Sequence, residues 1–97
     1  MDYGFHSEAA AELEAVLAYY DGEQAGLGRK FLAAVARAIS QIRMFPNASP
    51  KVSRRSRRCR TRRFPYGLVY QVLDGEIRII AVMDLRRKPG YWRDREE

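Results

Sequence analysis

The sequence has a single cysteine, Cys59, and a single histidine, His6. One cysteine cannot form a disulfide within the chain, and it cannot build a cysteine-based metal site. One histidine argues against a histidine-rich metal site and against an acid–base mechanism that uses two histidines. We therefore expect neither a metal nor another cofactor.

The sequence also lacks a long apolar segment. No apolar run is long enough to span a membrane, and the first residues have neither the basic region nor the apolar stretch of a signal peptide. No internal repeat or low-complexity linker divides the 97 residues, a length that suits one domain with a single core. These absences predict one cytoplasmic domain, residues 1–97, with no membrane partner.

Acidic residues are scarce, relative to basic ones, in the second half of the chain. Residues 1–50 carry four basic and six acidic side chains, whereas residues 51–97 carry fourteen basic and six acidic ones. Fifteen of the 18 basic residues are arginine, and seven of these lie between Arg54 and Arg63. Arginine keeps its charge at physiological pH and forms bidentate bonds with phosphate or carboxylate. The second half therefore predicts a surface for RNA, DNA or an acidic protein.

The first half begins with a short candidate strand at residues 3–6. Ser7 is a candidate N-cap for a helix that would continue to about Tyr20. Apolar residues recur along this helix at the spacing of a buried stripe. The sequence Asp21-Gly22 predicts its end.

A second helix is predicted from Gly26 or Leu27 to Phe45, because Pro46 disfavours helical geometry in the residue before it. Its apolar residues also form one stripe, with polar side chains on the opposite face. Two amphipathic helices with a short connection indicate an antiparallel helical hairpin.

The arginine-rich segment predicts a strand over residues 58–63. Alternation along this strand would place Arg58, Arg60 and Arg62 on one exposed face. The cysteine and the threonine between them would then point toward the helices.

Two further strands are predicted at residues 66–73 and 76–83. Both are nearly apolar throughout, which is typical of central strands covered on at least one face. Asp74-Gly75 between them is a strong hairpin signal. The predicted order is β-α-α-β-β-β plus a C-terminal tail. The fold class is α+β, with a two-helix antiparallel hairpin packed on one face of a small, mainly antiparallel sheet.

Three segments carry a resemblance to a known family. The first is the strand entry Phe64-Pro65-Tyr66-Gly67-Leu68-Val69-Tyr70, and the second is the ending Arg86-Arg87-Lys88-Pro89-Gly90-Tyr91-Trp92. The third is the second helix, which opens with Gly26-Leu27-Gly28 and closes with Ile42-Arg43-Met44-Phe45-Pro46. Together with the order of elements, they resemble the RelE/ParE superfamily of toxins from bacterial and archaeal type II toxin–antitoxin systems. The resemblance covers nearly the whole chain.

The resemblance implies a toxin with one of two activities. One branch of the superfamily cleaves messenger RNA in the ribosomal decoding site without a metal, and the other inhibits DNA gyrase. The resemblance also implies a cognate antitoxin that is acidic and partly disordered and folds on binding. Its apolar residues would cover the groove beside the two helices, and its acidic residues would meet the arginine face. A basic nucleic-acid-binding module without toxicity remains a third hypothesis.

For the nuclease activity, the resemblance implies catalytic roles for Arg62, Arg86 and Tyr91. The tail tyrosine of relatives falls on Trp92, which has no hydroxyl group, and Tyr91 is adjacent to it. Asp84 stands where relatives often have histidine or a small residue, and a carboxylate there would repel phosphate. The tail would therefore lack a well-suited proton donor and acceptor for RNA cleavage. Because a gyrase inhibitor needs only a shaped, basic and aromatic surface, inhibition of gyrase is the preferred interpretation.

The predicted contact surface for either target lies on the exposed strand face and the start of the tail. It comprises Arg58, Arg60, Arg62, Arg86, Arg87 and Trp92. The strand arginines have an alternative role as a solvated edge that prevents aggregation between sheets. Trp92 has an alternative role as an anchor that holds the tail against the domain.

Overall fold

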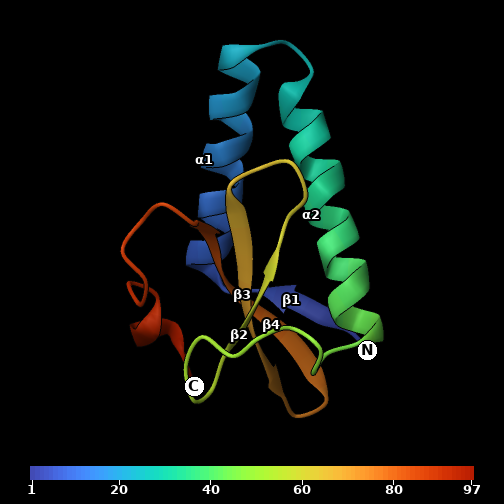
Figure 1. Ribbon diagram of the computed structural model, residues 1–97, viewed down its shortest axis with the longest axis vertical. Helices are drawn as coiled ribbons and strands as arrows, with labels where there is room; N and C mark the ends of the chain where they lie inside the picture. The colour runs from blue at the N-terminus through green and yellow to red at the C-terminus, as the bar shows by residue number, and fades with distance from the viewer.

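The computed structural model describes residues 1–97, and it confirms the predicted α+β fold and the order β-α-α-β-β-β with a C-terminal tail. Strands β1 to β4 form one sheet in the order β1-β4-β3-β2, in which only β1 and β4 are parallel. Figure 1 shows the two helices as an antiparallel hairpin that extends beyond one end of the sheet. The elements are β1 (Tyr3–Phe5), α1 (Ser7–Glu23), α2 (Leu27–Met44), β2 (Arg57–Arg60), β3 (Tyr66–Leu73), β4 (Glu76–Asp84) and the 3-10 helix η1 (Arg93–Arg95).

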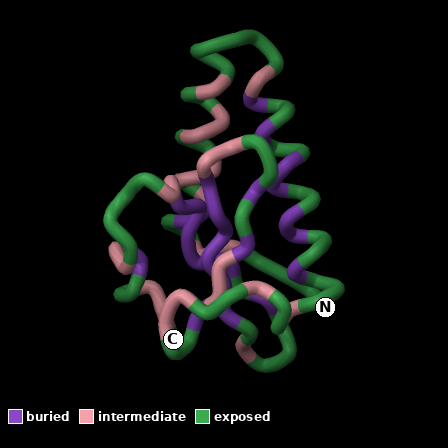
Figure 2. The backbone as a smooth tube through the Cα atoms, viewed as in Figure 1, coloured by how far each residue is buried: buried purple, intermediate pink, exposed green.

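The main core lies between the helices and one face of the sheet. Figure 2 shows buried residues concentrated in the central strands and along one side of α2. Burial of each large apolar side chain contributes about 1.5–3 kcal/mol to folding, so this layer holds the hairpin on the sheet. The predicted stripe of α1 packs against it as partly buried side chains. The buried members of this core are Ala9, Phe31, Val35, Ala38, Ile39, Ile42, Cys59, Tyr66, Leu68, Tyr70, Ile77, Ile79 and Val82.

The start of α1 differs by one residue from the prediction. The N-cap is His6 and not Ser7, which is the first helical residue. The Nδ1 atom of His6 accepts a hydrogen bond from the backbone N–H of Glu8 at 3.1 Å. A neutral imidazole has one acceptor nitrogen, so it can satisfy a free N–H at a helix start as a hydroxyl does.

The predicted end of α1 at Asp21-Gly22 was wrong, because the helix continues through these residues to Glu23. The aspartate caps the other helix instead. Its Oδ1 accepts a hydrogen bond from the backbone N–H of Gly28, in the first turn of α2, at 2.9 Å. A carboxylate at this position also interacts favourably with the positive end of the helix dipole. The predicted start of α2 is confirmed.

The strand predicted over the arginine-rich segment was wrong at its C-terminal end. Strand β2 ends at Arg60, and Arg63 adopts a left-handed conformation with a φ of 71°. The ring of Phe64 lies 5.0 and 5.1 Å from aromatic rings in α1 and α2, measured between centroids. This packing draws the chain toward the helices, so Arg62 lies in a turn and does not share the strand face with Arg58.

The hairpin between β3 and β4 was predicted correctly. Asp74 and Gly75 both have positive φ angles, 51° and 76°. A two-residue turn with positive φ at both positions matches the twist of the two strands that it joins.

Candidate target-binding surface

The face of the sheet opposite the helices is covered in part by the C-terminal tail. Trp92 is 1% exposed, and it packs in a second, smaller core with Val69, Ile80, Ala81 and Met83. Its side chain therefore anchors the tail, as the alternative interpretation of the sequence proposed. An indole at this depth cannot meet a target surface while the tail is docked. Trp92 is accordingly removed from the predicted contact surface.

The edge of β4 is sealed by Glu12 of α1 and by Arg95 of the tail. Strand β1 pairs with β4 only as far as Ile79. On the other side of β4, Ile79 and Ala81 pair with consecutive residues of β3. Ile80 between them has no partner in β3, so it is the extra residue of a β-bulge. Its carbonyl oxygen accepts a hydrogen bond from Arg95 Nη1 at 2.9 Å. Glu12 Oε1 accepts one from the backbone N–H of Val82 at 3.0 Å. These bonds satisfy backbone groups that would otherwise be unpaired at the sheet edge.

Glu12 and Arg95 also bind each other, and Tyr91 joins them. Arg95 donates hydrogen bonds to both Glu12 oxygens, at 2.9 and 3.2 Å, and the Tyr91 hydroxyl donates to Glu12 Oε2 at 2.9 Å. The side chains of Arg95 and Glu12 are only 9% and 19% exposed. This network, which we call the tail clamp (Glu12, Tyr91 and Arg95), connects the tail to α1.

The tail clamp decides what Tyr91 can do chemically. Burial, followed by the hydrogen bond and the negative charge of Glu12, raises the pKa of the Tyr91 hydroxyl well above its usual value. The Arg87 guanidinium covers the ring at 4.0 Å from its centroid. At neutral pH the hydroxyl keeps its proton and donates it to a structural acceptor, which makes it a poor general acid or base.

Arg86 is occupied by an intramolecular ion pair. Its Nε and Nη2 atoms lie 2.9 and 2.8 Å from the two carboxylate oxygens of Asp84. The hydrogen bonds from Arg86 hold the pKa of the Asp84 carboxyl below its usual value. The Arg86 side chain remains 71% exposed. Asp84 was expected to repel phosphate, and in the structure it also neutralises the adjacent arginine.

Arg62 lies at the same end of the sheet as Arg86. The backbone N–H of Leu85 donates a hydrogen bond to the carbonyl of Pro65 at 2.8 Å, which joins the start of the tail to the turn that contains Arg62. Arg62 is exposed, and it has no acidic partner, since the salt bridges of the chain involve only Arg78, Arg86 and Arg95. Of the two predicted catalytic arginines, only Arg62 carries an uncompensated charge.

Arg58 and Arg60 lie on β2, which is an edge strand of the sheet. Neither forms a salt bridge. The stem of Arg58 packs over Gly67, where its Cγ lies 2.9 Å from the position that a Cβ would take. Both arginines line a cavity of about 310 Å³, which also contains the exposed ring of Phe45.

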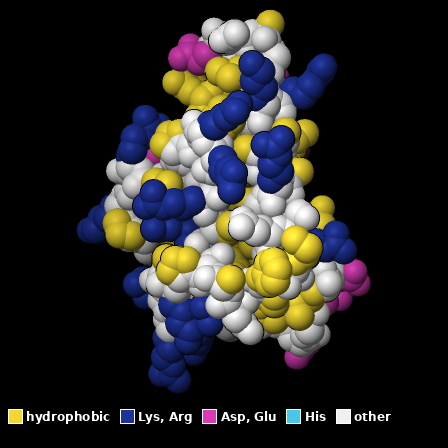
Figure 3. All heavy atoms as spheres, turned by 45° about the vertical axis from the view of Figure 1, so that its right-hand side comes forward, with side chains coloured by type: hydrophobic (Ala, Val, Ile, Leu, Met, Phe, Trp, Pro, Cys, Tyr) yellow, Lys and Arg dark blue, Asp and Glu magenta, His cyan; other side chains and the backbone are white.

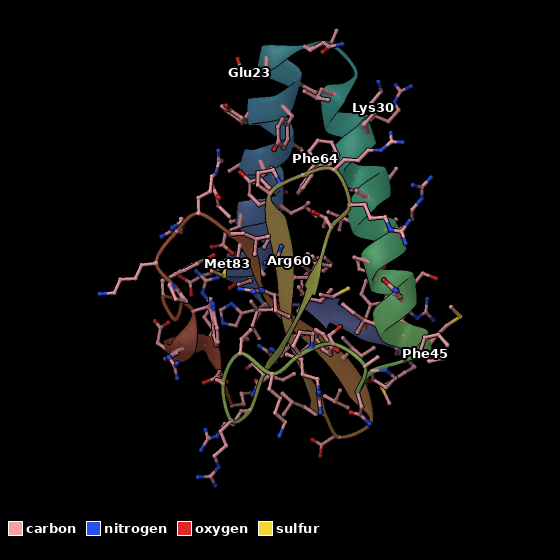
Figure 4. All side chains as sticks on the ribbon, viewed as in Figure 1. Glu23, Lys30, Phe45, Arg60, Phe64 and Met83 are labelled. Atoms are coloured by element: carbon pink, nitrogen blue, oxygen red, sulfur yellow. The ribbon has the colours of Figure 1, made fainter.

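Basic residues of α2 extend this arginine edge, and sequence reasoning missed their contribution. Figure 3 shows Lys and Arg side chains spread over the face that includes α2. Arg37 is exposed and lies one helical turn before Gln41, which lines the same cavity as Arg58 and Arg60. The first half of the chain has more acidic than basic residues, so the charge count hid this placement. We call the set Arg37, Arg58, Arg60, Arg62 and Arg63 the basic edge, in which Arg58 is half-buried and the others are exposed; Figure 4 labels Arg60, which lies on β2.

A helical hairpin on a four-stranded sheet, with a basic edge and a docked tail, defines a small α+β domain of the fold class that the resemblance to the RelE/ParE superfamily predicted. Residues 3–89 match the family described as the ParE toxin of the type II toxin–antitoxin system parDE, and the chain belongs to that family. Neither helix is both long enough and apolar enough to cross a membrane.

One solved structure supports the fold. The chain resembles a chain of the chromosomal ParDE toxin–antitoxin system from P. aeruginosa, with a TM-score of 0.78 and 19% sequence identity. The match covers 89% of this chain and 97% of that one. Among curated proteins, no sequence matches this chain.

Proposed function

We propose that this toxin arrests growth by inhibiting DNA gyrase, without cleaving RNA. The observation that carries the proposal is the bond between the Tyr91 hydroxyl and Glu12, which engages the tail group that a nuclease would need for proton transfer. The sole histidine serves as the N-cap of α1 and cannot replace it. Arginine is a poor proton donor or acceptor, because it keeps its charge.

A non-enzymatic inhibitor needs only a surface that binds its target. The basic edge offers guanidinium groups without acidic partners, and Phe45, which is 59% exposed, adds an aromatic contact beside them. Arginine and aromatic side chains dominate binding energies at protein interfaces. Gyrase acts on DNA in the cytoplasm, so the proposal places the toxin there.

Induction of the toxin is expected to stop DNA synthesis before protein synthesis. A gyrase inhibitor blocks replication first, whereas a ribosome-dependent nuclease depletes translated messages first. Pulse-labelling with thymidine and with methionine after induction measures the two rates side by side. Translation that stops first, with codon-phased cuts mapped in messages by primer extension, would replace the proposal with the RelE-like nuclease.

The partner that we assign to this toxin is a cognate antitoxin, as in the ParDE system that it resembles. An apolar groove of about 340 Å³ lies between β1 and the helical hairpin. Seven of its nine lining residues are hydrophobic, and two of them, Tyr3 and Leu32, are each 45% exposed. An amphipathic segment that folds in this groove would cover them, while its acidic residues reach the arginines. Folding on binding would let proteolysis of the antitoxin release the toxin.

Leu32→Ala is expected to weaken antitoxin binding about tenfold, because truncation of a central apolar contact costs more than about 1 kcal/mol. The side chain is half-exposed, so stability should change little. Isothermal titration with the purified product of the neighbouring gene measures the effect. Met44→Ala is the control, since Met44 is 65% exposed on the same helix but lies outside the groove. Equal affinities of the two variants would place the antitoxin elsewhere.

A further inference from the structure

The last residues of the chain lie against its most basic loop. The Oγ atoms of Ser53 and Ser56 each donate a hydrogen bond of 2.5 Å to the same carboxylate oxygen of Glu96. Ser53 Oγ also accepts bonds from the backbone N–H groups of Arg55 and Ser56, at 3.2 and 3.1 Å, which close the turn around the carboxylate. Ser56 is only 1% exposed. The turn thus forms a cradle that holds a carboxylate.

Glu97, the residue after Glu96, forms bonds through its main chain as well as through its carboxylate. The backbone N–H of Glu97 donates to Gln71 Oε1 at 3.0 Å, and Gln71 Nε2 donates to the main-chain oxygen of Glu97 and to the carbonyl of Arg55, each at 3.4 Å. Gln71 is 2% exposed. The carboxylate of Glu97 lies 2.9 Å from Arg78 Nη1. The side-chain amide of Gln71 therefore pairs with the main-chain N–H and main-chain oxygen of one residue, Glu97.

These polar groups form a built site, because burial of polar groups is costly unless each has a bonding partner. Ser56 and Gln71 are among three buried polar residues of the chain. Glu96 accepts the hydroxyl bond of Ser56, Glu97 supplies the donor to the Gln71 amide oxygen, and Glu97 and Arg55 share the Gln71 amide nitrogen. The oxygen of the Gln71 amide requires a donor, and a peptide N–H is one, whereas a phosphodiester offers only acceptors. The pattern of groups therefore favours an acidic peptide over the phosphate groups of a nucleic acid.

We propose that Ser53, Ser56, Gln71 and Arg78 form a binding site for an acidic peptide segment, and that Glu96 and Glu97 occupy it as an intramolecular competitor. Exposed arginines at positions 54 and 55 flank the site and attract acidic residues. A tethered segment has an effective concentration of the order of millimolar, so a ligand from another chain must exceed this competition. The ligand we assign, an acidic segment of the antitoxin, rests on the proposed function, whereas the site itself does not.

The test uses the full-length chain and a fluorescein-labelled synthetic peptide with the sequence of residues 93–97. The double variant E96Q/E97Q removes both carboxylates that fill the site. It is expected to bind the peptide at least about tenfold more tightly than the wild-type chain, measured by fluorescence anisotropy. D94N is the matched control, because it removes an acidic charge of the tail that forms no hydrogen bond or salt bridge in the structure. It should bind as the wild-type chain does.

A second pair of substitutions, S53A/S56A in the E96Q/E97Q chain, should abolish the gain while thermal unfolding shows an intact fold. No gain in E96Q/E97Q, or a gain that survives S53A/S56A, would overturn the proposal. A gain for a labelled single-stranded oligonucleotide, but not for the peptide, would mean that the tail covers a nucleic-acid surface instead.

If E96Q/E97Q fails to fold, millimolar peptide added to the wild-type chain should shift the side-chain amide NMR signals of Gln71, and unchanged signals would refute the site. These measurements use neither toxicity nor the antitoxin. A negative result would therefore reject the peptide site without bearing on the proposed inhibition of gyrase.

Discussion

Replacing Glu12 with alanine is expected to lower the free energy of unfolding by about 3–5 kcal/mol, the cost of removing one partner from a buried ion pair. Arg95, whose side chain is 9% exposed, would keep its charge with only the more exposed Glu8, 3.4 Å from its Nε, as an acidic partner. The backbone N–H of Val82 and the hydroxyl of Tyr91 would lose their acceptor as well. Urea denaturation followed by circular dichroism measures the change.

The matched control is Glu14→Ala, because Glu14 lies on the same helix, is exposed and forms no hydrogen bond or salt bridge. A surface change of this kind alters stability by no more than about 0.5 kcal/mol. If Glu12→Ala also cost less than about 1 kcal/mol, the tail clamp would contribute little to stability. The tail would then be held mainly by Trp92.

Arg62→Ala is expected to reduce toxicity much more than Arg86→Ala. Loss of a hydrogen bond from a charged group costs about 1.5–3 kcal/mol, which corresponds to a roughly tenfold to 150-fold loss of affinity. Arg62 has no acidic partner and can give its whole charge to a target, whereas Asp84 already neutralises Arg86. Growth after induction reports the effect in cells, and the affinity of the purified chain for gyrase reports it in solution.

Arg29→Ala controls for the loss of one positive charge, since Arg29 is an exposed arginine in the first turns of α2 and lies outside the basic edge. It should remain as toxic as the wild-type chain. All three variants should stay folded, because none of these side chains is buried. Equal loss of toxicity in Arg62→Ala and Arg86→Ala would show that the target displaces Asp84 from its ion pair.

The elements of the fold were largely predictable because their signals are local. The Asp74-Gly75 turn, the apolar stripe of α2 and the apolar strands on either side of the turn depend on residues close together in sequence. The errors lie where a distant residue intervened. Helix α1 passes its predicted stop because Asp21 caps the neighbouring helix, and β2 ends early because Phe64 packs on the helices.

For the proposed contact surface, the sequence predicted which residue types are present but not how each side chain is placed. Alternation predicted an exposed strand face, and on the edge strand β2 Arg60 is exposed whereas Arg58 is half-buried. The burial of Trp92 was one of two alternatives, and only its packing with Ile80 and Met83 decided between them. The engagement of Tyr91 by Glu12 spans 79 positions of the chain, so no local pattern could show it.

The sequence by itself determined the α+β fold, the superfamily and the arginine-rich character of the second half. Helix periodicity, strand alternation and local charge are properties of residues close together in sequence. They do not depend on how the elements pack in three dimensions. Only the tertiary structure decided which charges are free. Arg86 is paired with Asp84, Arg95 with Glu12, and Glu96 with two serines, whereas Arg62 is unpaired. Pairing depends on distances between side chains, and except for Arg86 and Asp84 those distances join segments that only folding brings together.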